Sequence, residues 1–258
     1  VTGNRIVGFR GTSDERNTSQ TEPIIHDIST NQRVSLNRKY SPVDPSLVFM
    51  DGSTSTAEAV GVATTNADNE MLDIFKAGKF LNSFNLTDVA LSDYGRTVSF
   101  NDNEIALGYG SNAADLHDTN DRERLVEKTF IVDIHDIATK AKKRSFDMGR
   151  VSVDMLRLSR DGKFVASAHD SQLSIYDSSD GSEVFATSFG TPSSLVWLDD
   201  ERLIVSSSDK GAYLINARER SGQTLFASRS LRISAVNIVG NKIIYSGFST
   251  NKDFSANE

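Results

Sequence analysis

The sequence has 258 residues, of which 38% are hydrophobic, and a formal net charge of −7 at pH 7. A chain of this size buries a substantial core, and no stretch approaches the roughly 18 consecutive apolar residues that span a membrane. We therefore expect no membrane span. The acidic balance argues against direct nucleic-acid binding, which needs a basic surface. The absence of cysteine excludes disulfides and thiolate chemistry and leans slightly toward an extracytoplasmic setting, without fixing the compartment.

Turn-forming Ser, Asp, Asn and Gly residues recur every 8 to 12 residues, a spacing typical of an all-β fold. The first strand that this pattern predicts is Asn4–Arg10. It is similar to Asn241–Phe248 near the other end, and both have the character of the second strand of a repeated unit. The chain then begins inside one unit and stops inside another, so we expect a fragment of a longer protein.

Five segments predict the third strand of successive units. In chain order they are Ile24–Asp27, Leu72–Phe75, Phe130–Asp133, Leu173–Asp177 and Tyr213–Asn216. The unit is clearest between Asp154 and Leu225, where a pattern of about 40 residues is written twice. Each copy resolves into four short strands separated by turn residues.

The first copy contains Met155–Gly162, Lys163–Asp170, Leu173–Asp177 and Ser182–Ala186, and the second contains Ser194–Asp200, Arg202–Asp209, Ala212–Asn216 and Gln223–Ala227. This pattern resembles the WD40-like, or YVTN-type, β-propeller repeat. In that family the first strand ends in a Ser-x-Asp-Gly turn, the second in small residues before Asp, and the third near Trp-Asp. Tyr176-Asp177 stands where that dipeptide would be. The resemblance implies an all-β propeller of four-stranded blades, with six or seven blades in the complete ring.

We expect a single propeller domain over residues 1–258. Its blades are predicted at 1–39, 44–86, 87–150, 152–190 and 192–230, with an incomplete blade at 232–258. Two arrangements remain open: the terminal strands combine into one closing blade, or the ring continues in sequence outside this chain. Closure matters because an open ring exposes unpaired strand edges.

Three polar inserts, Gly11–Glu22, Gly110–Lys128 and Ser249–Glu258, lie between predicted second and third strands. Such connections emerge on the face that also carries the blade-to-blade connections, which propellers commonly use for binding. A short helix capped by Thr119 or Asn120 is expected in the longest insert. Surface loops without a role are the alternative, because loop insertions cost little entropy. The residues interpreted as partner-binding are Asp14, Glu15, Arg16, His117, Asp118, Arg122, Arg124 and Glu127.

A catalytic or metal site would need carboxylates that converge at the ends of the innermost strands. The candidates near such positions are Asp44, Asp88 and Asp154. Alignment of Leu91-Ser92 with Leu158-Ser159 puts Thr87 opposite Asp154, and a one-residue offset turns Asp88 to the other face. The histidines lack metal-ligand spacing, and no nucleophile or phosphate-binding motif occurs. We predict no catalytic residue, no metal ligand and no cofactor.

Asp170 and Asp209 follow second strands and are interpreted as structural turn residues that accept backbone hydrogen bonds. Asp177–Glu183 lacks the alternation of a calcium loop and predicts a hairpin turn with Gly181 at positive φ.

Trp197 shares the predicted register of Leu158 and Leu91, and Phe49 takes the same place in the second blade. Strands buried between neighbouring blades read as nearly continuous apolar runs. We therefore predict that Trp197 belongs to the core.

These observations favour a non-catalytic protein–protein interaction platform, a subunit or adaptor of a larger assembly that binds through its loop-rich face. The acidic balance favours a partner with a basic surface. The alternative from another class is an extracytoplasmic propeller that binds a small molecule, glycan or metal in its central channel, with hydrolase or lactonase activity.

Overall fold

The computed structural model describes residues 5–13, 19–27, 31–36, 48–51, 59–66, 69–76, 79–86, 97–110, 129–149, 153–169, 171–227, 231–239 and 242–249. Every regular element within these ranges is a β-strand. No helix long and apolar enough to cross a membrane is found in this part of the chain. The all-β class expected from the spacing of turn residues is confirmed.

The described strands form six antiparallel sheets, called sheets 1 to 6 in chain order. Sheet 1 contains β1 (Arg5–Ser13), β2 (Ser19–Asp27) and β3 (Gln32–Ser35). Sheet 2 contains β4 (Val48–Asp51), β5 (Ala59–Asn66), β6 (Asn69–Lys76) and β7 (Lys79–Asn85). Sheet 3 contains β8 (Thr97–Phe100), β9 (Glu104–Gly110), β10 (Phe130–Asp136) and β11 (Lys142–Asp147). Sheet 4 contains β12 (Met155–Leu158), β13 (Phe164–His169), β14 (Gln172–Asp177) and β15 (Glu183–Ser188). Sheet 5 contains β16 (Pro192–Trp197), β17 (Arg202–Ser207), β18 (Gly211–Asn216) and β19 (Ser221–Phe226), and sheet 6 contains β20 (Leu231–Val239) and β21 (Lys242–Ser249).

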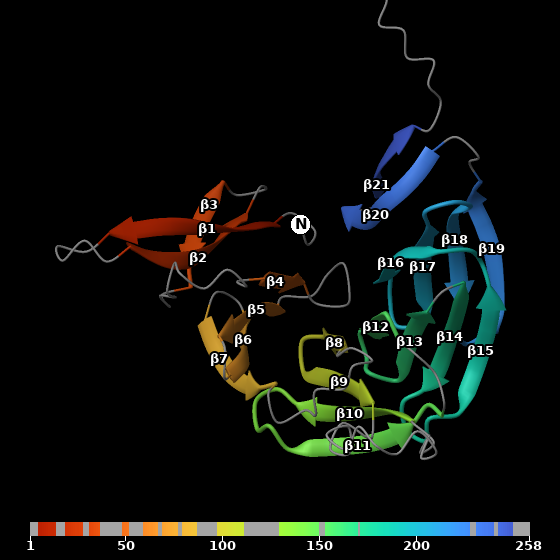
Figure 1. Cartoon of the computed structure of the whole chain (residues 1–258), viewed down its shortest axis with the longest axis horizontal. Coiled ribbons are helices and arrows are strands. Elements are labelled where there is room, and N and C mark those ends of the chain that lie inside the picture. Colours follow the sequence, from red (N-terminus) through yellow and green to blue (C-terminus); the bar gives the residue numbers. More distant parts are fainter. Residues whose placement is uncertain are drawn as a thin grey trace, which may run out of the picture.

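The sheets follow one another around a common centre (Figure 1). Each four-stranded sheet is an up-and-down meander, and its first strand lies nearest the middle. The innermost strands contact their neighbours, since β12 lies against β8 on one side and β16 on the other, and β16 lies against β20. The five segments predicted as third strands lie in β2, β6, β10, β14 and β18.

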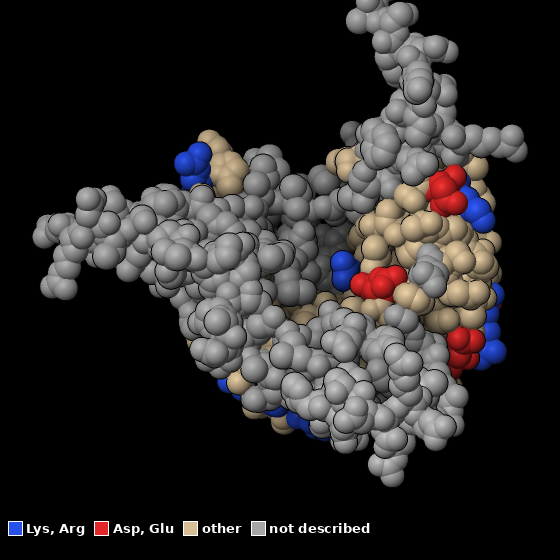
Figure 2. All heavy atoms as spheres, viewed as in Figure 1, with Lys and Arg blue, Asp and Glu red and all other residues tan. Residues whose placement is uncertain are grey.

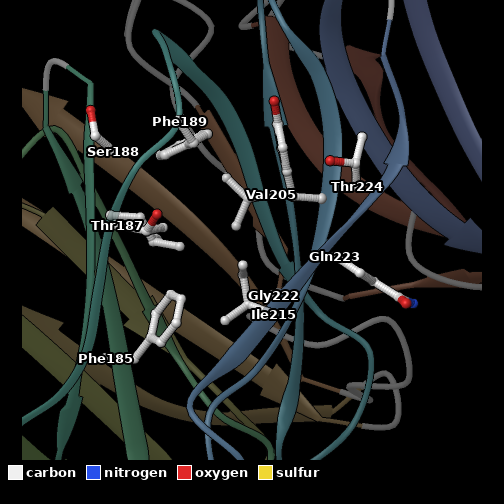
Figure 3. Close-up of a pocket in the computed structure, with 11 residues that line it drawn as sticks. Phe185, Thr187, Ser188, Phe189, Val205, Ile215, Gly222, Gln223 and Thr224 are labelled. Carbon is white, nitrogen blue, oxygen red and sulfur yellow. The ribbon is translucent and has the colours of Figure 1, made fainter.

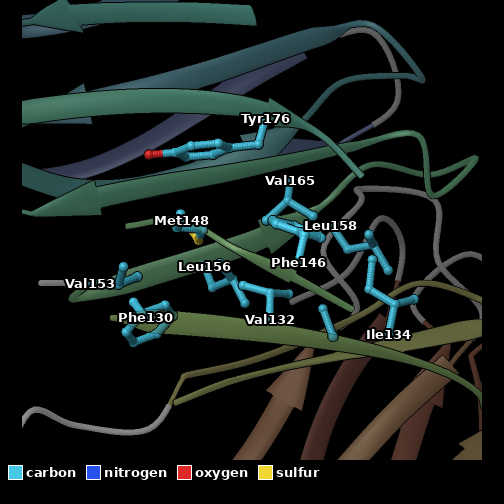
Figure 4. Close-up of a cluster of buried hydrophobic side chains, with 11 residues drawn as sticks. Phe130, Val132, Ile134, Phe146, Met148, Val153, Leu156, Leu158, Val165 and Tyr176 are labelled. Atoms are coloured by element: carbon cyan, nitrogen blue, oxygen red, sulfur yellow. The ribbon is translucent and has the colours of Figure 1, made fainter. Parts of the chain in front are cut away.

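The core lies between successive sheets. Figure 4 shows Val132 and Phe146 of sheet 3 packed toward Leu156 and Val165 of sheet 4. The second strands β9, β13 and β17 are buried along most of their length because another sheet covers each face. Full burial of one such side chain contributes about 1.5–3 kcal/mol. Trp197 is fully buried, as predicted.

Hydrogen bonds also join the innermost strands of neighbouring sheets. The Trp197 indole Nε1 donates to the Arg157 carbonyl at 3.0 Å, which ties sheet 5 to sheet 4. The Asn101 side-chain amide donates to the Ser159 carbonyl at 3.0 Å, which ties sheet 3 to sheet 4. These two side-chain donors are therefore satisfied across the sheet boundary, and the bonds help to fix the spacing of the sheets.

The prediction that the innermost strand of sheet 3 contains Leu91 was wrong. That strand is β8, and its Phe100 pairs with Ile105 in the way that Leu158 pairs with Val165. Phe100, and not Leu91, therefore takes the position of Leu158. The alignment that placed Thr87 opposite Asp154 fails with it, and Thr87, Asp88 and Leu91 lie outside the described residues.

Two further expectations change. Phe49 does not take the position of Leu158 in sheet 2. That register position belongs to Asp51, which lies two residues after Phe49 in β4. The insert Gly11–Glu22 is not a loop throughout, because β1 and β2 stay paired as far as Ser13 and Ser19. Only residues 14–18 of that insert lie outside the described strands.

Candidate functional site

All eight residues predicted to bind a partner lie outside the described part of the chain. They are Asp14, Glu15, Arg16, His117, Asp118, Arg122, Arg124 and Glu127. Asp170, predicted as a structural turn residue, lies outside it as well. Asp209 is described, and the partner-binding role of the inserts stays a prediction.

The face on which we expect the inserts also carries several described turns. In an antiparallel meander, second-to-third connections and sheet-to-sheet connections emerge on the same side. Asp154 and His169 meet there, with the Asp154 Oδ2 2.9 Å from the His169 Nδ1. Viewed along the ring axis, the middle of the molecule is hollowed, and acidic and basic side chains lie side by side next to the hollow (Figure 2). The described residues contain no group of three or more His, Cys, Asp or Glu that could hold a metal ion.

The Asp209 carboxylate links two connections on this face. Its Oδ1 accepts a hydrogen bond from the Thr191 backbone N–H at 3.1 Å and another from the Ser207 hydroxyl. The Ser207 hydrogen bond is the largest cause that lowers the pKa of Asp209. Gly190, at φ +98°, passes so close that a Cβ there would lie 2.6 Å from the Asp209 Oδ1. These contacts are those of a turn-stabilising residue, and that role stays a prediction.

Basic side chains of β11 pair with acidic side chains of β9 and β10. Lys142 lies 2.9 Å from Asp133, and Arg144 lies 2.7 Å from Glu104. Burial disfavours the charged form of Asp133, but hydrogen bonds from Ser145, Lys142 and Tyr109 outweigh it and lower the pKa of Asp133. Burial, together with the hydrogen bond to Asp133, raises the pKa of Tyr109 to about 12.

A pocket of about 300 Å³ opens between the outer strands of sheets 4 and 5. Figure 3 shows Phe185, Thr187 and Phe189 from sheet 4 and its exit on one side, with Ile215 and Gly222 of sheet 5 across from them. None of its lining residues is charged. They are Leu173, Phe185, Thr187, Ser188, Phe189, Val205, Tyr213, Ile215, Gly222, Gln223 and Thr224.

Strand register explains why this pocket exists. Sheets that radiate from a centre leave a wedge between their outer strands, which side chains must fill. In sheet 2, Phe84 pairs with Leu72, and in sheet 3, Phe146 pairs with Val132. Both phenylalanines are 6% exposed. The same register position in sheet 4 is Thr187, which pairs with Leu173, so this wedge lacks its aromatic side chain.

Two further residues keep the wedge between sheets 4 and 5 open: Phe185 of sheet 4 and Gly222 of sheet 5. Two residues before the phenylalanine, sheets 2 and 3 carry Asn82 and Arg144, which donate to backbone carbonyls of the next sheet at 2.9 to 3.1 Å. Sheet 4 carries Phe185 there and makes no such bond through it. Across the wedge, Gly222 pairs with Ile215. A Cβ at Gly222 would lie 2.8 Å from the Ile215 Cδ1, so a larger residue there would crowd this wall of the pocket.

Sequence reasoning missed this pocket, although a signal was available. The fourth strands end in Phe84-x-Leu86, Phe146-x-Met148 and Thr187-x-Phe189. Alignment of these three endings shows one threonine where the other two sheets carry phenylalanine.

No family model and no curated protein matches this sequence. By structure, the chain is similar to a KlHsv2 variant with loop 6CD replaced by a Gly-Ser linker, with a TM-score of 0.51 and 13% identity over 94% of this chain and 73% of the other. It is also similar to a chain in the mitotic checkpoint complex, with a TM-score of 0.50 and 12% identity over 92% and 71% of the two chains. A third similar structure is the C-terminal WD40 domain of Sif2, with a TM-score of 0.50 and 14% identity over 94% and 64%.

The chain thus spans between 64% and 73% of the length of these three chains. In all, 891 chains of known structure match, so the likeness is to a widely used fold and not to one activity. Together with the four-stranded meanders arranged around a centre, these matches show the architecture of the molecule. The chain has the fold of a WD40-like β-propeller.

Proposed function

We propose that the chain is a non-catalytic protein-interaction platform, a subunit or adaptor of a larger assembly that binds a partner through its loop-rich face. The observation that carries this proposal is that sheets 3, 4 and 5 are packed and hydrogen-bonded to one another. Innermost strands are joined by hydrogen bonds such as Trp197 Nε1 to the Arg157 carbonyl, and apolar side chains fill the space between sheets. A stiff disc of this kind holds several variable connections in fixed relative positions.

The described part of the loop-rich face supports a polar contact. The Asp154 side chain is 57% exposed and that of its partner His169 is 35% exposed, so this pair faces solvent. An exposed pair of this kind contributes little to stability, about 0–1 kcal/mol. Its carboxylate therefore remains available to a partner with a basic surface, in keeping with the formal net charge of −7.

The test is an affinity capture from the source organism with three baits. The first is the intact chain, the second has 110–128 replaced by a short Gly-Ser turn, and the third carries Asp154→Lys. Glu219→Lys serves as the matched control, because Glu219 is exposed on the turn between β18 and β19, on the opposite face. Loss of a partner from the second or third bait, with retention by the control, supports the proposal. Equal capture by all baits would overturn it.

A further inference from the structure

We infer that the pocket between sheets 4 and 5 binds an extended segment of a partner protein, and that this segment inserts one uncharged aromatic side chain in the place where Phe84 and Phe146 lie in the two preceding wedges. The inference goes beyond the proposed function, because it assigns a second binding surface on the rim of the disc. It does not depend on the inserts of the loop-rich face.

The chemistry of the inserted group follows from the equivalent wedges. Phe84 lies against His135, with ring centroids 6.5 Å apart, and Phe146 packs into the cluster that contains Tyr176. In the wedge between sheets 4 and 5, Ile215 takes the third-strand position that His135 and Tyr176 hold in sheets 3 and 4. An aromatic ring placed there would therefore meet an apolar wall. Phe185 and Phe189 extend the same surface on the other side of the pocket.

Charge selects an uncharged group. The lining residues carry no formal charge, so a Lys, Arg, Asp or Glu side chain entering the pocket would lose its hydration without gaining an ion pair. Gln223 and Thr224 are exposed residues of the pocket lining, so their polar side chains are accessible to the backbone of a ligand. The pocket therefore suits an apolar ring attached to a polar chain.

The strands beside the pocket favour an extended peptide. Within the described residues, β15 ends sheet 4 and β19 ends sheet 5, so each presents one edge that pairs with no further described strand. An added strand at such an edge gains backbone hydrogen bonds, while a pocket beside it reads an alternate side chain. A free aromatic compound would gain only the second of these contributions.

The experiment uses an uncharged probe, the pentapeptide acetyl-Ser-Thr-Phe-Thr-Ser-amide, and its counterpart with alanine at the centre. Binding to the full chain is followed by the amide NMR shifts of Gly222, Gln223 and Thr224. We expect saturable shifts with the phenylalanine peptide and affinity lower by about tenfold or more with the alanine peptide. The variant Thr187→Phe supplies the missing ring from within and should lower affinity by a similar factor.

Ala186→Phe is the matched control, because successive residues of a strand point to opposite faces and Ala186 is exposed. It should bind the phenylalanine peptide as the unaltered chain does. Thr187→Leu repeats the test with a smaller plug if the phenylalanine variant fails to fold. Absence of shifts, or equal affinity in the Thr187 variants and the unaltered chain, would overturn the inference. If N-acetyl-phenylalaninamide bound as tightly as the phenylalanine peptide, the inference of an extended segment would be overturned and the ligand would be a small aromatic compound. Replacement of 110–128 should leave peptide binding unchanged, which separates this outcome from that of the proposed function.

Discussion

Asp209 shows how one exposed carboxylate can stabilise two connections at once. Removal of its charge and one acceptor by Asp209→Asn should lower the free energy of unfolding by about 1 kcal/mol, because the Thr191 N–H and the Ser207 hydroxyl lose a charged acceptor. The pKa of Asp209 in the folded chain is lowered. The contribution should therefore be complete above the unfolded pKa of about 3.9 and disappear as the pH falls through the folded pKa. Urea unfolding of both chains from pH 7 down to about pH 2 measures this difference, with the exposed Asp200→Asn as control. A difference that grows as the pH falls would contradict the role.

Two glycines with nearly the same backbone conformation offer a matched test of the Glu104–Arg144 ion pair, which lies within sheet 3 and contacts Gly162 of sheet 4. Gly162 has φ +76° and Gly149 has φ +79°. A Cβ at Gly162 would lie 2.1 Å from the Glu104 Oε2, whereas a Cβ at Gly149 would meet nothing within 4 Å. Both alanine variants should lose about 1 kcal/mol from backbone strain.

Gly162→Ala should lose about 1–3 kcal/mol more, because Glu104 must move away from Arg144, to which it is bonded at 2.7 Å. Urea unfolding followed by the fluorescence of Trp197, the single tryptophan of the chain, measures both variants. Equal losses would mean that the Glu104–Arg144 pair shifts at no cost.

At the scale of the strand, Phe146 and Thr187 hold the same register position in the fourth strands of sheets 3 and 4, but they differ in size. Phe146→Thr should therefore reproduce in the wedge between sheets 3 and 4 the space that surrounds Thr187. We expect a loss of about 3–4 kcal/mol, because Phe146 is 6% exposed and its neighbours cannot fully close the gap. Thr187→Phe should change the melting temperature in the opposite direction. Thermal unfolding of the two variants is the measurement, and a rise for Phe146→Thr would show that the register positions are not equivalent.

The strands that could be predicted are those whose signals are local. Third strands such as Leu173–Asp177 carry a short apolar run followed by turn residues, and such a run needs no tertiary information. The prediction of the innermost strand of sheet 3 was wrong because Ser92-Asp93-Tyr94-Gly95 resembles the turn Ser159-Arg160-Asp161-Gly162, which follows the innermost strand of sheet 4. The structure instead makes that turn after β8 with Asn101, whose Oδ1 accepts from the backbone N–H groups of Asn103 and Glu104.

The pocket could not be read from any single repeat. It depends on which side chains of two different sheets face one wedge, and therefore on the register of four strands at once. Thr187 and Gly222 are unremarkable in their own strands, and only their opposition across the wedge leaves space. The inserts of the proposed loop-rich face differ from the pocket in this respect. The sequence shows where an insert lies, but it does not show the conformation of that insert.

At the scale of the whole molecule, sheet 6 differs from the complete sheets beside it. Ile243 and Ile244 of β21 are 40% and 50% exposed. Leu203 and Ile204, which hold the same register positions in β17, are 0% exposed because further strands and a neighbouring sheet cover them. Among the described strands, β21 pairs only with β20, so this sheet presents an apolar surface next to a strand edge. Such a combination favours association with other strands.

We therefore expect the double variant Ile243→Lys, Ile244→Lys to reduce self-association of this chain while changing its free energy of unfolding by no more than about 0.5 kcal/mol, since both side chains already contact water. Lysine on an edge strand opposes pairing with another edge because its charge would have to be buried. Sedimentation velocity over a range of concentrations measures the association, and urea unfolding measures the stability. The matched double variant Leu203→Lys, Ile204→Lys should fail to fold, because it buries two charges between complete sheets. If the β21 variant unfolded as readily as the β17 variant, the two isoleucines would be part of a core that is closed in solution, and the edge of sheet 6 would already be covered.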